Sequence, residues 1–114
     1  MGLDAPALLA AACGATGLHD FGDPGFREGL DVLLAALARD AALNEIGRLA
    51  HEALLGGYLQ QRLRIADWYE RHPEIARERI GGPLFLTGLP RTGTTALAHL
   101  LAAHELGVKN LVII

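Results

Sequence analysis

Residues 83–101, PLFLTGLPRTGTTALAHLL, contain the change of pattern that decides how the last third of this chain folds. Leu84–Thr87 is a short apolar run, which is typical of a strand buried on both faces. Gly88–Thr94 carries two glycines and a proline, so we expect a loop there. From Thr95 to Ala103 the residues favour a helix. The stretch therefore predicts a strand, a loop and a helix in direct succession.

A second strand is expected soon after that helix. Gly107 can end the helix, and Leu111–Ile114 is a further apolar run. Strand, helix and strand within about 30 residues form one βαβ unit. We therefore predict an α/β protein in which residues 81–114 are the first βαβ unit of a P-loop-type parallel sheet. Two such strands leave edges uncovered, so we expect the sheet to be truncated and the chain to self-associate.

The residues before this unit, 1–80, are expected to form a mostly helical region. Apolar side chains recur there at helical spacing. Asp23-Pro24 and Asn44 are good helix starts, whereas Gly56-Gly57 should weaken or bend the helix that contains it. The residue before Pro73 avoids helical angles, which predicts a boundary. We expect helices over 5–13, 24–39, 44–69 and 73–79.

Composition excludes several classes of protein. Half of the residues are hydrophobic (51%) and the net charge is −3 with no basic run, which argues against a nucleic-acid-binding surface. The single cysteine, Cys13, can form neither an internal disulfide nor a structural zinc site. No window is apolar enough for a membrane span, and the N-terminus has no signal-peptide pattern. We therefore predict a cytoplasmic protein without a membrane span.

The segment Gly88–Thr95 has the spacing of a phosphate-binding loop, G-x-x-x-x-G-K-[ST], with Thr94 in the position of the lysine. The two glycines let backbone N–H groups turn inward and let an anion approach closely. The start of the following helix adds unpaired N–H groups and the positive end of the helix dipole. Arg91 adds a permanent charge with a planar fork of donors.

The missing lysine changes the expected ligand. A Walker-type ATPase uses that lysine on the β- and γ-phosphates and the next hydroxyl on magnesium. Thr94 cannot supply the charge, and Arg91 supplies it from inside the loop instead. We therefore expect a site for one phosphate-like group beside a transferable anion, without a metal ion.

Residues 86–102, LTGLPRTGTTALAHLLA, resemble the phosphosulfate-binding loop of sulfotransferases, whose general form is a strand, then P-[KR]-[ST]-G-[ST]-[ST], then a helix. The preceding phrases FGDPGFREGLDVLLAAL and HPEI are similar to those of bacterial sulfotransferase-like proteins, and the resemblance covers residues 18–103. It implies the co-substrate 3′-phosphoadenosine 5′-phosphosulfate and transfer of its sulfuryl group to an acceptor hydroxyl or amine. It also implies that Arg91 stabilises charge on the bridging oxygen, and that the donor is bound by Pro90, Arg91, Thr92, Gly93, Thr94 and Thr95.

The resemblance implies further contacts that this sequence does not contain. The family's 3′-phosphate contacts lie well downstream of the loop, and only 19 residues follow Thr95. We therefore expect an N-terminal fragment that is inactive by itself, with its base and acceptor not identified. Two other hypotheses remain open. One is a degenerate P-loop nucleotide-binding fragment, and the other is a non-enzymatic helical module whose exposed strand joins a partner's sheet.

Overall fold

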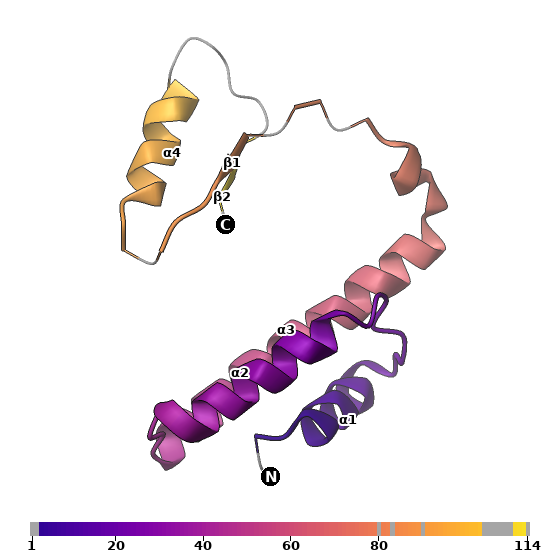
Figure 1. The fold of residues 1–114 in the computed structure, drawn as a ribbon. Coiled ribbons are helices and arrows are strands. Elements are labelled where there is room, and N and C mark those ends of the chain that lie inside the picture. Colours follow the sequence, from indigo (N-terminus) through magenta and orange to yellow (C-terminus); the bar gives the residue numbers. More distant parts are fainter. Residues whose placement is uncertain (1–2, 80, 83, 90, 104–110, 114) are drawn as a thin grey trace. The chain divides into compact units, whose positions relative to one another are not determined.

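A computed structural model describes residues 3–79, 81–82, 84–89, 91–103 and 111–113 of the chain. The described residues are mostly helical, which confirms the predicted helical character. They divide into two compact units, Met1–Ile75 and Ala76–Ile114. Figure 1 shows the helices α1, α2 and α3 in the first unit and the helix α4 with two short strands in the second. No helix among the described residues is long and apolar enough to cross a membrane.

Three α-helices make up the first unit: α1 (Ala5–Thr16), α2 (Phe26–Asp40) and α3 (Glu45–Arg71). A short 3-10 helix, η1 (Pro73–Arg77), replaces the longer helix expected over 73–79. The predicted break before Pro73 is confirmed, since α3 ends at Arg71. We expected Gly56-Gly57 to weaken or bend this helix. Instead, α3 is one continuous helix of 27 residues that includes both glycines.

Polar side chains fix where two of these helices begin. The Asp4 carboxylate accepts a hydrogen bond from the Ala7 N–H at 2.8 Å at the start of α1, and the Asn44 side-chain oxygen accepts one from the Gly47 N–H at 2.7 Å at the start of α3. Such caps satisfy N–H groups that the helix itself leaves unpaired. Asp23 was expected to do the same for α2, and this was wrong: its carboxylate accepts from the Gly25 N–H and closes a tight turn before the helix.

The core of the first unit lies where α1 packs along α3. On α3 the side chains of Leu55, Leu59 and Leu63 are spaced four residues apart, so they lie on one face of the helix. Leu63 is completely buried. The other buried members of this cluster, from α1, α2 and the connection between them, are Leu8, Ala12, Phe21 and Leu30.

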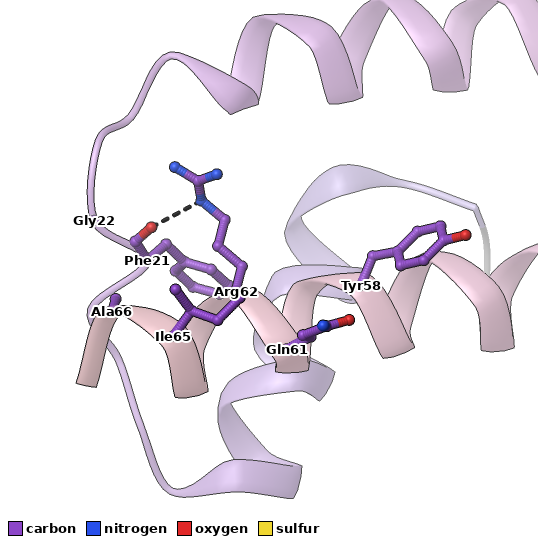
Figure 2. A pocket seen from close by; sticks show the side chains of 7 residues that line it. All are labelled: Phe21, Gly22, Tyr58, Gln61, Arg62, Ile65 and Ala66. Carbon is purple, nitrogen blue, oxygen red and sulfur yellow. Dashed lines mark hydrogen bonds between the residues drawn. The ribbon is translucent and has the colours of Figure 1, made fainter. Parts of the chain in front are cut away.

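Arg62 ties the connection between α1 and α2 to α3 (Figure 2). Its Nε donates to the Phe21 carbonyl at 2.8 Å and its Nη2 donates to the Asp23 carbonyl at 2.8 Å. The guanidinium also lies over the Phe26 ring, 4.3 Å from the ring centre. A single side chain therefore orders the turn that leads into α2.

The second unit contains β1 (Leu84–Leu86), α4 (Thr94–Ala103) and β2 (Leu111–Ile113). The two strands pair in parallel, with Leu84 opposite Leu111 and Leu86 opposite Ile113, and α4 packs against β2. The expectation of a strand buried on both faces was wrong for β1, because Leu84 is 42% and Phe85 57% exposed. Gly107, expected to end α4, lies outside the described residues.

Candidate anion-binding loop

The segment between β1 and α4 contains the residues that the sequence analysis assigned to an anion site. The loop before α4 contains Arg91, Thr92 and Gly93. The first two residues of α4 are Thr94 and Thr95. Pro90, the remaining predicted site residue, lies outside the described residues. The structure thus brings the described members together within one loop and one helix end.

Two residues of this loop have left-handed backbone angles. Gly93 has a φ of 91°, and Arg91 has a φ of 65°. Glycine adopts such angles at no steric cost, which explains Gly93. For Arg91 the same region costs roughly 1–2 kcal/mol, because the Cβ approaches the carbonyl oxygen. Backbone held in such regions is concentrated at ligand-binding sites, so the conformation of Arg91 supports a binding role for the loop.

The Thr92 hydroxyl closes the loop. Its Oγ1 donates a hydrogen bond to the Leu89 carbonyl at 2.6 Å, so it is already engaged within the loop. The first helical hydrogen bond of α4 runs from the Leu97 N–H to the Gly93 carbonyl at 3.0 Å. The N–H groups of Thr94 and Thr95 therefore have no carbonyl within the helix to bond. They are the donors that the loop offers to a ligand.

A hollow of about 400 Å³ opens at this helix end. Its lining combines the Arg91 side chain, the glycine turn and the first residues of the helix: Arg91, Gly93, Thr94, Thr95 and Ala96. Among the ion pairs between described residues, none involves Arg91, so its guanidinium is not neutralised by a carboxylate of the described chain. A permanent positive charge, free helix N–H groups and two hydroxyls around one hollow suit an oxyanion.

Gly88 was expected to let N–H groups turn inward and to let an anion approach closely. Its φ lies outside the left-handed region. Its importance is steric: a Cβ built at Gly88 would lie 2.8 Å from Thr94 Cγ2 and 2.9 Å from Thr92 Oγ1. Ala96, which the sequence analysis did not single out, also lines the hollow, and its place in the first turn of the helix was the available signal.

Comparisons with protein-family models, curated proteins and solved structures found no match to this chain. The likeness to sulfotransferases therefore rests on the residues of the loop and on the phrases that precede it.

Gly88→Ala is expected to lower anion binding about tenfold or more, because the new methyl group displaces Thr92 and Thr94 from their places. The measurement is titration of the full chain with inorganic sulfate and adenosine 3′,5′-bisphosphate. Gly57→Ala is the matched control, since a Cβ there meets nothing within 4 Å. The control should keep full binding and raise the stability of α3 by about 0.5–1 kcal/mol. Equal binding by both variants would show that the packing around Gly88 does not shape the site.

Proposed function

We propose that the loop of residues 88–95 binds the 5′-phosphate end of an adenosine phosphosulfate and that the chain supplies this part of a sulfotransferase. The observation that carries the proposal is the hollow at the start of α4, lined by Arg91, Gly93 and two threonines. Its described lining offers hydrogen-bond donors and one side-chain cation, Arg91, and the first helical turn contains no lysine. That set suits one phosphate-like group rather than a magnesium-bound triphosphate.

The chemistry would be transfer of a sulfuryl group from the phosphosulfate to an acceptor hydroxyl or amine. As the acceptor oxygen or nitrogen forms its bond to sulfur and gives up its proton to water, the bond from sulfur to the bridging oxygen breaks, and negative charge develops on the departing 5′-phosphate. The helix N–H groups hold that phosphate, and the Arg91 guanidinium stabilises the charge on the bridging oxygen. Preorganised donors of this kind commonly provide the largest catalytic contribution.

The arrangement of the second unit supports this proposal. A strand leads into the loop, a helix follows it, and β2 returns parallel to β1. We infer that these elements are the first βαβ unit of a P-loop-type parallel sheet. In such sheets the ligand lies beyond the carboxyl ends of the strands, where loop 88–95 begins.

The test is titration of the isotope-labelled chain with adenosine 3′,5′-bisphosphate, sulfate and magnesium ATP, followed through backbone amide shifts. We expect saturable shifts confined to residues 88–96, with the bisphosphate and sulfate competing for the same residues. Affinity should be weak, because adenine contacts are not part of the loop and each lost factor of ten is about 1.4 kcal/mol. Shifts that map elsewhere would overturn the proposal. Tighter binding of magnesium ATP would favour the nucleotide-binding alternative instead.

A further inference from the structure

One face of α3 carries an apolar stripe that the core does not use. Its members are spaced 4, 3, 4 and 3 residues apart and are defined here as the outer stripe: Leu54, Tyr58, Gln61, Ile65 and Trp68. The four apolar members are 51%, 60%, 49% and 52% exposed in that order. Gln61, the single polar member, lies at the centre of the stripe and is also exposed.

The outer stripe is separate from the core-facing side of the same helix. Leu55, Leu59 and Leu63 are buried against α1 and its neighbours. A surface helix of a globular protein normally has one apolar stripe, which faces the core. A second stripe with a strict 4–3 repeat is the pattern of a helix that packs lengthwise against another helix of the same repeat.

Two adjoining hollows run along the stripe. One, of about 320 Å³, is lined by Tyr58, Gln61 and Ile65 together with Phe21, and Figure 2 shows these side chains around it. The other, of about 440 Å³, is lined by Gln61, Ile65 and Trp68 together with Arg64, Tyr69 and Ile75. Because both share Gln61 and Ile65, they form one groove along the second half of α3.

We propose that the outer stripe is a dimer interface occupied by α3 of a second copy of this chain, in parallel orientation about a two-fold axis. In that orientation each stripe residue faces its own counterpart. Gln61 then meets Gln61 of the second copy, and the two amides can hydrogen-bond to each other. In an antiparallel coiled coil the two core positions of the heptad face each other, so Gln61 would lie opposite Tyr58 or Ile65 of the second copy and its amide would lose the matching amide partner, which costs free energy. A single polar residue in such a seam is a known way to fix register.

The charges beside the stripe allow this contact. Arg62 donates to two backbone carbonyls, and Arg71 is paired with the Asp67 carboxylate. In a parallel pair, flanking residues that are five positions apart in sequence meet across the two helices. Arg64 of one copy therefore lies beside Tyr69 of the other, and its guanidinium can stack on that ring.

The apolar surface is sufficient for a weak dimer. Aromatic side chains bury about 150–250 Å² each, and Tyr58, Trp68 and the neighbouring Tyr69 are all more than half exposed. With Leu54 and Ile65 the stripe offers roughly 500 Å² per copy, or about 1,000 Å² in the dimer, the lower limit for a specific interface.

The test is sedimentation velocity of the full chain over a concentration series, with substitutions at exposed positions. We expect a monomer–dimer equilibrium that Ile65→Glu weakens at least tenfold. Val32→Glu is the matched control on α2, where the side chain is 65% exposed, and it should leave dimerisation unchanged. Far-UV circular dichroism of each variant checks that the helices remain.

A cross-linking experiment tests the register. In a Cys13→Ala background, Gln61→Cys should form a disulfide-linked dimer under mild oxidation, whereas Val32→Cys should not, because a disulfide needs Cα atoms within about 7 Å. Equal cross-linking of both would overturn the proposed register. A chain that stays monomeric, or a dimer that survives Ile65→Glu and is lost in Phe85→Ser, would overturn the interface. The last result would place association at the exposed strand β1.

Discussion

Arg91→Ala is expected to lower the affinity of the loop for adenosine 3′,5′-bisphosphate by roughly 10- to 100-fold. Hydrogen bonds to charged groups contribute about 1.5–3 kcal/mol, and 1.4 kcal/mol corresponds to a factor of ten. Arg91 lines the hollow, and no carboxylate among the described ion pairs competes for it. Arg91 is the only side-chain cation among the described residues of that lining, so none of those neighbours can replace the charge when its guanidinium is removed.

Two further variants at this position separate charge from backbone strain. Arg91→Gly also removes the guanidinium but accepts the φ of 65° without penalty. It should therefore stabilise the loop and still lose binding. Arg91→Lys keeps a charge without the planar fork, so its affinity should lie between the two extremes. Amide-shift titration and isothermal calorimetry give the affinities. If Arg91→Gly binds as tightly as the unmodified chain, charge does not drive binding and the anion-site proposal fails.

The helices of the first unit could be predicted where their signals are local. Asn44 and the bond before Pro73 act within a few residues, and α3 begins and ends where they indicate. The helix at Gly56-Gly57 depends instead on packing contacts with residues that are distant in sequence. Leu55 and Leu59, on either side of the two glycines, are buried against other helices, and such packing outweighs the intrinsic cost of glycine in a helix. No reading of the local sequence contains that contribution.

The site residues could be named from the sequence, but their roles depended on backbone angles. Nothing in the sequence marks Arg91 as left-handed, since glycine and asparagine are the residues that favour this region. Thr92 was expected to contact the ligand through its backbone, and nothing in the sequence indicates that its hydroxyl bonds the Leu89 carbonyl within the loop. Gly88 also leaves space for the side chains of Thr92 and Thr94, which only the folded loop reveals. Side-chain direction in a loop follows from the φ of the preceding residues, which residue type alone does not fix.

Leu63→Ala is expected to destabilise the first unit by about 2–5 kcal/mol, the usual cost of truncating a buried leucine and leaving a cavity. Leu63 is 0% exposed and is the largest completely buried side chain among the described residues. The unit has about 75 residues, and at about 0.05–0.15 kcal/mol per residue its whole stability is roughly 4–11 kcal/mol. The substitution therefore removes about half of the stability, and the melting temperature should fall by roughly 8–40 °C.

Thermal unfolding of the chain, followed through its helical circular dichroism signal at 222 nm, measures this loss of stability. Leu49→Ala makes the same chemical change on the same helix at a side chain that is 59% exposed and lies outside the outer stripe. Because nothing is lost from the core and alanine is the better helix former, the control should change stability by about 0.5 kcal/mol or less. A shift of equal size in both variants would mean that helix propensity, and not the packing of Leu63 against the core, holds the unit together.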